Sequence, residues 1–136
     1  MSGARHYSEL IVWQLADEIR VNVFELTCRP GFKQDFRLRS QTDDAIASVC
    51  RNIAEGFGGT DAEFGRYLII ARMSLNELSD SLRAALLKNY ITHEDLRMTR
   101  ELSRRLHPAL AGLVHHLEKK LMRARHFGSR GRRWQT

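Results

Sequence analysis

Apolar residues recur every three or four positions through four long segments, and this spacing constrains the fold more than any other feature of the sequence. Residues three and four apart share one face of an α-helix, so each segment is expected to form an amphipathic helix. The turns between the segments are short, which favours consecutive helices lying antiparallel. The sequence therefore predicts an all-α protein, an antiparallel up-down-up-down four-helix bundle. In the first helix the residues expected to face the core are Ile11, Val12, Leu15, Ala16, Ile19, Val23 and Leu26.

Start and stop signals give the bounds of these helices. The residues 29–31, Arg-Pro-Gly, end the first helix. Thr60 followed by Glu63 is typical of a capping box, and Thr92 is placed to cap the last helix. Pro108 interrupts that last helix, but the apolar spacing continues in phase across it, which predicts a kink without a break. The expected helices cover residues 8–28, 34 or 35–56, 60–89 and 92–125.

Positive charge gathers at the C-terminal end of the chain. The 136 residues include 22 Lys or Arg and 16 Asp or Glu, a net charge of +6. Seven of the basic residues follow Glu118 and no acidic residue does, so residues 1–118 carry 15 basic and 16 acidic side chains. Such a distribution favours a basic arm on a near-neutral body. We expect one domain, a bundle over residues 1–125, followed by a basic, flexible tail over residues 126–136.

Several classes of protein are excluded by composition. No apolar run approaches the roughly 18–20 residues that span a bilayer, and no apolar stretch typical of a signal peptide follows Met1. Cys28 and Cys50 are too few for a disulfide scaffold or a zinc site. We therefore expect two reduced thiols in a cytoplasmic protein that has no membrane partner.

No motif predicts an enzyme. His107, His115 and His116 share one helix, but a metal-binding pair on a helix needs a spacing of four residues. The glycines of residues 56–59 are not followed by the Lys-Ser or Lys-Thr of a phosphate loop, and Ser40 has no histidine in its own helix to activate it. The sequence predicts no catalytic residue, no metal and no cofactor.

Two helices carry a second apolar row opposite the row that faces the core. One bundle would leave these rows exposed, and an apolar patch of that size is typical of an interaction surface. We therefore predict a homo-oligomer whose interface consists of Leu10, Trp13, Val21, Phe24, Ile69, Met73 and Leu87.

Basic residues follow the outer side of the last helix and continue into the tail. They favour a surface that contacts nucleic-acid phosphates. Glu94, Glu101 and Glu118 interrupt this side, so a solvated face with local ion pairs is the alternative. The candidate nucleic-acid-binding residues are Arg97, Arg100, Arg104, Lys119, Lys120, Arg123, Arg125, Arg130, Arg132 and Arg133.

Several short segments resemble one bacterial family. They are Val12-Trp13-Gln14-Leu15-Ala16, Ser40-Gln41, Asn52-Ile53-Ala54-Glu55-Gly56, Glu63-Phe64, Tyr67-Leu68, Ile70-Ala71-Arg72, Ser74-Leu75-Asn76-Glu77-Leu78 and Tyr90-Ile91. Over about residues 7–121 the chain resembles the proteins encoded in 23S rRNA intervening sequences, which are similar to the accessory variability determinant of diversity-generating retroelements. The resemblance implies a four-helix bundle in a cyclic, pentameric ring without catalytic residues. Binding to RNA or to a reverse transcriptase is the role of the retroelement relatives, whereas the function of the intervening-sequence branch is obscure, so RNA or a reverse transcriptase is an expected partner by this relation alone.

The chain departs from this family at two places. Asp43 and Asp44 stand where many relatives carry a basic pair, and Cys50 stands where relatives often have proline. The first change weakens a nucleic-acid role for that face of the second helix. Our leading hypothesis is a non-enzymatic oligomeric module that binds RNA or a nucleoprotein. The alternatives are a protein–protein scaffold with no nucleic-acid role and, as a third, an enzyme.

Overall fold

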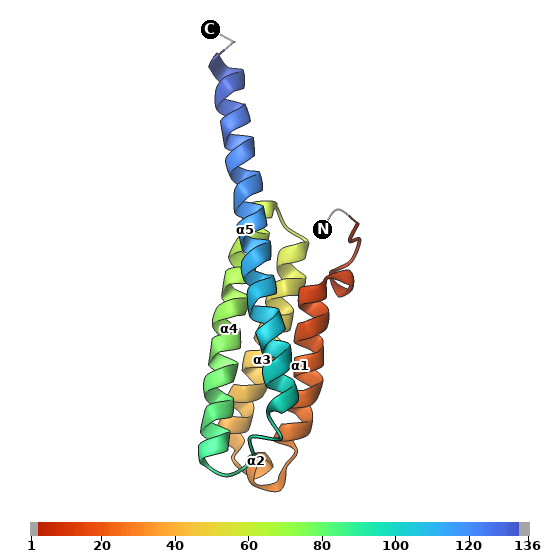
Figure 1. The fold of residues 1–136 in the computed structure, drawn as a ribbon, viewed down its shortest axis with the longest axis vertical. Coiled ribbons are helices and arrows are strands. Elements are labelled where there is room, and N and C mark those ends of the chain that lie inside the picture. Colours follow the sequence, from red (N-terminus) through yellow and green to blue (C-terminus); the bar gives the residue numbers. More distant parts are fainter. Residues whose placement is uncertain (1–2, 134–136) are drawn as a thin grey trace.

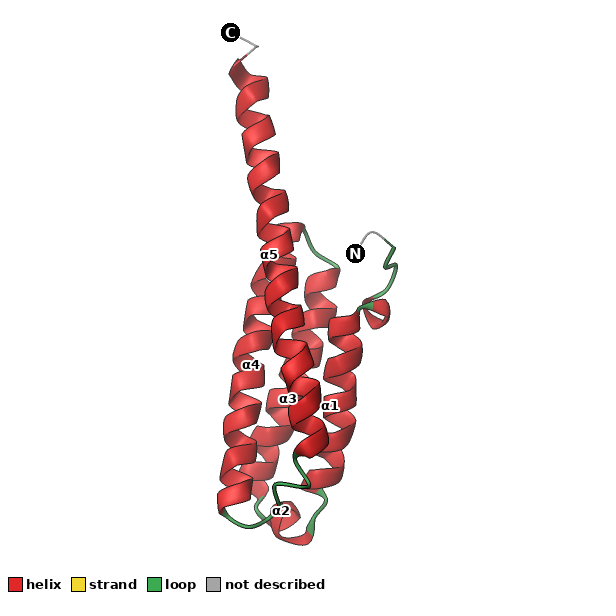
Figure 2. Cartoon of the chain, viewed as in Figure 1, coloured by secondary structure: helices red, strands yellow, loops and turns green. Residues whose placement is uncertain are grey.

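The computed structural model describes residues 3–133, with side chains through Phe127. Over these residues the chain forms helices and loops and contains no strand, so the all-α prediction is confirmed. Figure 2 shows how little of the chain lies outside helices. The helices are the short 3₁₀ helix η1 (Tyr7–Glu9), α1 (Ile11–Thr27), α2 (Pro30–Gln34), α3 (Phe36–Phe57), α4 (Asp61–Leu87) and α5 (Arg97–Arg133).

The long helices α1, α3, α4 and α5 lie side by side (Figure 1), and their buried apolar residues form one core. α1 packs against α3 and α5, and α4 packs against the same two helices. The connection that contains α2 lies at the lower end of the bundle in Figure 1, and the connection from α3 to α4 lies at the upper end. α5 starts at the lower end, runs the length of the bundle and extends beyond it.

The core follows the expected apolar spacing, with one exchange at the start of α1. Leu15, Ile19 and Val23 are buried as expected. Ile11 is 66% exposed, although it was expected in the core, and Leu10 is 6% exposed, although it was expected on the outer row. The helical wheel fails here because α1 begins only at Ile11: Leu10 is its N-cap, with extended φ and ψ of −74° and 132°.

The capping signals are present, but α5 differs from the expected fourth helix at both ends. At the start of α4 the Glu63 amide donates to Thr60 Oγ1 at 3.2 Å. Thr92 and Asp95 cap each other reciprocally, because the Asp95 amide donates to Thr92 Oγ1 at 3.1 Å and the Thr92 amide donates to Asp95 Oδ2 at 2.9 Å. This turn precedes α5, which begins at Arg97.

At its other end α5 reaches Arg133, so the expected end at about Arg125 is wrong. The apolar spacing stops before this stretch, but a helix can continue without a buried face when it extends one that is already formed. The helix is unbroken at Pro108, as the phase of its apolar residues predicted. The last residues of the expected tail, 134–136, lie outside the described residues.

The short helix α2 was not expected from the sequence. Pro30 occupies its first turn, where a proline removes no intrahelical hydrogen bond and its fixed φ suits a helix. Phe32 is fully buried and its ring lies 5.9 Å from the ring of Tyr90. The segment expected to end the first helix therefore also starts a new one, which closes the lower end of the bundle (Figure 1).

Asp35 ties this lower end together. Its carboxylate caps α3 by accepting from the Leu38 amide at 3.2 Å. It also accepts from Lys88 Nζ and from the Tyr90 hydroxyl, both at 2.9 Å. These bonds, the one from Lys88 first, lower the pKa of Asp35 to about 2. A carboxylate from the α2–α3 junction is thus linked to the segment that follows α4.

α3 and α4 approach each other closely. Gly56, near the end of α3, is buried, and a β-carbon there would lie 2.6 Å from Cβ of Tyr67. Further along the same contact, Ser48 Oγ lies 2.7 Å from Ser74 Oγ, and Asn52 Nδ2 donates to the Ser48 carbonyl at 2.7 Å. Small residues let the two backbones come together, and the polar side chains between them bond to one another.

Candidate nucleic-acid interface

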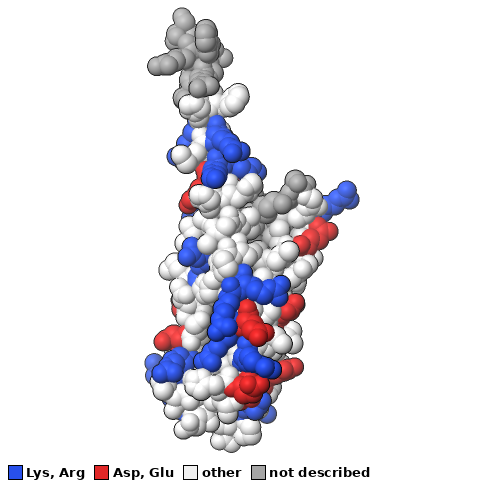
Figure 3. Space-filling model, in the orientation of Figure 1, with Lys and Arg blue, Asp and Glu red and all other residues white. Residues whose placement is uncertain are grey.

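The candidate basic residues fall into two groups on α5. In Figure 3, Lys and Arg atoms gather on the lower half of the body and again on the part of α5 above the bundle. Arg104, in the lower group, and Lys119, in the upper group, are 15 positions apart, which is about 22 Å along a helix. The expected strip is therefore two separate patches, a proximal one on the bundle and a distal one on the extension.

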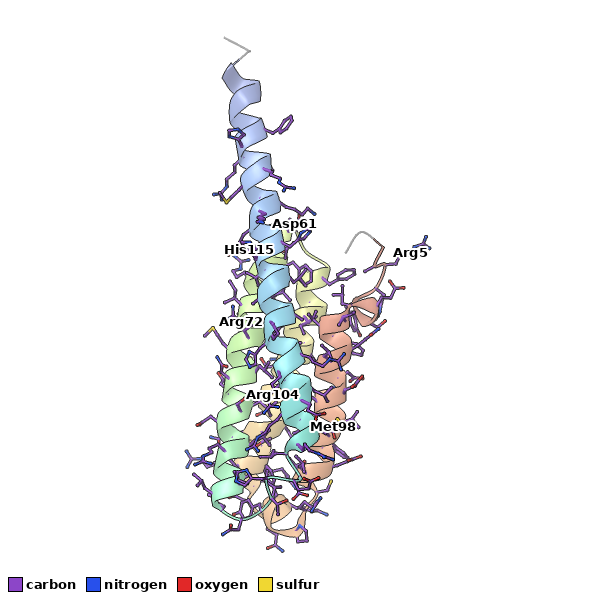
Figure 4. The ribbon with its side chains drawn as sticks, viewed as in Figure 1. Arg5, Asp61, Arg72, Met98, Arg104 and His115 are labelled. Carbon is purple, nitrogen blue, oxygen red and sulfur yellow. The ribbon has the colours of Figure 1, made fainter. Side chains whose placement is uncertain are left out.

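The proximal patch consists of Arg97, Arg100 and Arg104. Arg97 makes an exposed ion pair with Glu94, at 3.4 Å, as the solvated-face alternative expected. Arg100 is half-buried, and its Nη1 lies 3.2 Å from Nδ1 of His93. Arg104 is exposed, and Figure 4 shows it on the lower part of α5, near the start of the helix. Arg104 forms no ion pair with any residue that the structure describes.

The distal patch consists of Lys119, Lys120, Arg123 and Arg125, all exposed. Lys120 Nζ pairs with Asp61 Oδ2 at 3.2 Å, which ties α5 to the first residue of α4. Figure 4 shows Asp61 at the upper end of the bundle. Arg130, Arg132 and Arg133 lie on the helical backbone of α5, beyond the part of the chain whose side chains are described. The distal patch thus begins where α5 leaves the bundle.

One basic residue that the sequence analysis missed joins the proximal patch. Arg83, on α4, lines a groove of about 410 Å³ with Arg100 and Arg104 of α5. Periodicity assigns residues to faces of their own helix, and it does not show which faces of two helices meet. Arg83 therefore carried no signal in the sequence. The groove continues past Thr99 and His107.

The histidines and cysteines do not gather into a reactive site. Burial, followed by the charge of Arg72, lowers the pKa of His107. Burial also raises the pKa of the Cys50 thiol to about 11, so this cysteine is an unreactive core residue, while Cys28 is exposed and both thiols are free. Among the described residues, no three His, Cys, Asp or Glu side chains are placed to hold a metal ion.

The second apolar rows are largely exposed on the single chain. Val21 and Phe24 of α1 are 56% and 66% exposed, and Ile69, Met73 and Leu87 of α4 are exposed as well. Trp13 is half-buried, because its ring packs edge-on against Tyr7 at 5.2 Å and lies 5.9 Å from the guanidinium of Arg20. With Leu10 in the core, the outer row of α1 is reduced to its C-terminal half and part of Trp13.

Comparison with known proteins places the chain in a family. No helix in the described part of the chain combines the length and the apolar character needed to cross a bilayer. No curated protein matches the chain. The family model of the 23S rRNA-intervening sequence protein matches residues 8–112, which include the proximal patch and leave the distal patch outside. Because this match covers more than half of the chain, the protein belongs to the family of 23S rRNA-intervening sequence proteins.

Proposed function

We propose that the protein is a non-enzymatic, homo-oligomeric RNA-binding module of the cytoplasm. The observation that carries the proposal is the distal patch. α5 extends beyond the bundle with Lys119, Lys120, Arg123 and Arg125 exposed, and no acidic residue follows Glu118. An extended cationic helix suits the backbone of a nucleic acid, where phosphates repeat regularly. Arginine, which makes up most of the basic residues, can bond a phosphate through two parallel N–H groups.

The frame for this surface is an up-down-up-down bundle. In that arrangement α5 is the last helix and leaves the bundle at the end opposite to the one where it begins. Its anchored half packs against α1 and α4, and its free half carries the distal patch. Contacts to phosphates position a protein on RNA without reading the sequence, so the proposed binding depends on salt and very little on sequence.

The groups with shifted pKa values support a non-enzymatic role. Asp35 and Asp95 have lowered pKa values because they accept hydrogen bonds in helix caps and ion pairs. Cys50 and His107 are shifted first by burial. Active sites bring such groups together in one cleft. The raised pKa values of Lys88 and Tyr90 come from their hydrogen bonds to Asp35, so this cluster of shifted groups belongs to a helix cap and an ion pair. Cys50 lies in the core, and His107 lines the groove between α4 and α5.

The exposed apolar rows support homo-oligomerisation. Val21 and Phe24 form an outer surface on α1, and Ile69, Met73 and Leu87 form another on α4. Two unlike surfaces on one chain suit a head-to-tail contact, which forms a ring when the rotation between neighbouring subunits closes. A cyclic pentamer is the assembly that the family resemblance implies. A ring would present several copies of the distal patch, and linked copies bind one RNA more tightly than a single copy does.

The test is the salt dependence of RNA binding by the full chain and by a chain truncated after Glu118. Fluorescence anisotropy with a labelled single-stranded RNA should show binding that weakens steeply as salt rises, with a slope of about 0.7 per phosphate contacted. The truncated chain lacks seven basic residues and should bind more weakly with a shallower slope. Failure of the full chain to bind RNA at low salt would contradict the proposal and favour the protein–protein scaffold or a reverse transcriptase as the partner.

A further inference from the structure

The groove between α4 and α5 has a cationic lining. Arg83 comes from α4, and Arg100 and Arg104 come from successive turns of α5, so three guanidinium groups line one space of about 410 Å³. No aspartate or glutamate lines it. Two arginines spaced four residues apart lie on the same side of a helix, about 6 Å apart along its axis. Groups of one sign in a concave site reinforce each other's attraction for an anion.

These arginines are not neutralised by the fold. Neither the side chain of Arg83 nor that of Arg104 forms an ion pair or hydrogen bond with any described residue, and the side chain of Arg100 lies within hydrogen-bonding distance of Nδ1 of His93 alone. Elsewhere in the described chain, Arg20, Arg29 and Arg97 each pair with a carboxylate. The guanidinium donors of Arg83 and Arg104 are therefore free to bind a ligand, and they are gathered in one groove.

A second observation at the groove is a buried hydroxyl group, that of Thr99, that has no hydrogen-bond partner in the part of the chain that the structure describes. Thr99, which lines the groove, is 3% exposed, and its Oγ1 is the one buried side-chain oxygen or nitrogen in the described residues that has no hydrogen-bond partner. Buried hydroxyls nearly always have a partner, because leaving one without costs free energy. A ligand seated in the groove would give this hydroxyl the acceptor that the protein does not.

We infer that the α4–α5 groove is a phosphate-binding site, in which Arg83, Arg100 and Arg104 hold the phosphate oxygens and the Thr99 hydroxyl donates to one of them. Resting on the proposed function, the expected ligand is a phosphodiester of an RNA strand. A free phosphate has the same chemistry and is distinguished by experiment. The groove is a site on the bundle itself, separate from the distal patch that first attracts the RNA.

The decisive variant removes two unpaired arginines from the groove. Arg83→Gln with Arg104→Gln should weaken binding of a labelled single-stranded RNA by at least about tenfold and make its salt slope shallower. The matched control is Arg51→Gln with Arg66→Gln, which removes two exposed arginines on α3 and α4 that also lack ion pairs and do not line the groove. The control should change affinity by less than about threefold. Equal losses in both variants would overturn the inference and leave RNA binding in place.

Thr99→Val separates a ligand role from a structural one. Valine keeps the shape of threonine and removes the hydroxyl that lacks a partner, so the free protein should melt at the same or a higher temperature. RNA affinity should fall severalfold in the same variant. A lower melting temperature with unchanged affinity would show that Thr99 serves the fold alone and would remove it from the site.

A separate measurement tests the groove if the full chain binds no RNA. The melting temperature is compared in sodium phosphate and in sodium chloride at equal ionic strength. A rise in phosphate that is absent from the Arg83→Gln, Arg104→Gln protein and present in the Arg51→Gln, Arg66→Gln control supports a site for free phosphate, although the proposed RNA function has failed. No rise, or an equal rise in all three proteins, overturns the groove inference as well.

Discussion

At Gly56 a single missing methyl group decides how closely α3 and α4 can pack. A β-carbon on this residue would overlap Cβ of Tyr67 at 2.6 Å and touch the Phe64 ring at 3.0 Å. Cβ of Tyr67 is fixed to its backbone and cannot rotate away, so relief requires the helices to separate. Glycine is therefore needed at position 56 because of the close approach of Tyr67 on α4. The backbone conformation of Gly56 is helical and would also accept other residues.

Gly56→Ala should therefore destabilise the fold by about 1–3 kcal/mol, the usual cost of overpacking a tight contact. The measurement is urea unfolding followed by circular dichroism. Gly65→Ala on α4 is the matched control, because its added methyl group meets open space. There the change should stabilise the protein by about 0.5–1 kcal/mol, since alanine favours a helix over glycine. Destabilisation of similar size at both sites would contradict the proposed overlap.

Asp35 gives the protein a stability that depends on pH. Its pKa is about 2 in the fold and 3.8 in the unfolded reference, so its contribution is present above about pH 4 and is lost as the pH falls toward 2. Asp35→Asn keeps a capping side chain but removes the charge that Lys88 and Tyr90 bind.

The Asp35→Asn protein should melt at a lower temperature than the wild type at pH 7, and this gap should lose most of its size between pH 4 and pH 2. Melting curves across this range provide the test. Asp44→Asn, which changes an exposed carboxylate outside the described ion pairs, should leave the gap near zero at every pH. A gap that is as large at pH 2 as at pH 7 would mean that the charge of Asp35 is not what stabilises the lower end.

At the scale of the helix, Pro108 lowers the stability of α5 because one helical hydrogen bond is missing there. Proline has no amide hydrogen, so the carbonyl of Arg104, four residues earlier, receives no helical hydrogen bond from this position. The apolar residues on either side of Pro108, Leu106 and Leu110, are fully buried. Their packing in the core keeps the helix continuous although this hydrogen bond is missing.

Pro108→Ala should restore the hydrogen bond and stabilise the protein by about 1–3 kcal/mol, because the side chain at 108 is exposed and has little packing to lose. Urea unfolding measures the change. Gly112→Ala, in open space one turn further along α5, controls for the gain in helix propensity alone and should give about 0.5–1 kcal/mol. If Pro108→Ala gains no more than Gly112→Ala, the missing hydrogen bond costs nothing here.

At the scale of the whole molecule, we expect the exposed apolar rows of α1 and α4 to form the interface of a homo-oligomer. Phe24 is a better probe of it than Trp13, because Phe24 is 66% exposed whereas Trp13 also packs against its own chain. Phe24→Glu places a charge where a neighbouring subunit is expected, and burying that charge unpaired costs several kcal/mol. Light scattering should show a smaller particle, with helical circular dichroism retained. Met122→Glu, on the extension of α5, should keep the wild-type mass; a monomeric wild type would contradict the assembly itself.

Much of this fold could be predicted from the sequence because the signals are local. The spacing that buries Leu15, Ile19 and Val23 and the cap at Thr60 are both properties of neighbouring residues. The burial of Leu10 and Ile11 was predicted the wrong way round, which shows the limit of that approach: a helical wheel applies only where the backbone is helical. Leu10 lies just before α1 begins.

The candidate site was less predictable because it is made between elements. Basic residues on α5 could be named from their own helix, but the meeting of Arg83 with Arg100 depends on how α4 and α5 pack. The unpartnered hydroxyl of Thr99 likewise becomes visible only when every neighbour is in place. The continuation of α5 to Arg133 could not be predicted from apolar spacing, because no such spacing is present in that segment.

The extension of α5 has a thermal consequence. Beyond Lys120, which is held by Asp61, residues 121–133 continue for about 20 Å. A free peptide of that length is a marginal helix because its first turn is costly to form, but here the bundle already supplies that turn. Helicity in this segment should then decline gradually from the C-terminal end on warming, giving a sloping baseline before the bundle melts. Over the same range Arg123 and Arg125 would pass from a rigid helix to a flexible segment, while Lys120 stays paired with Asp61. Temperature would then alter how far this part of the distal patch extends toward the proposed RNA ligand.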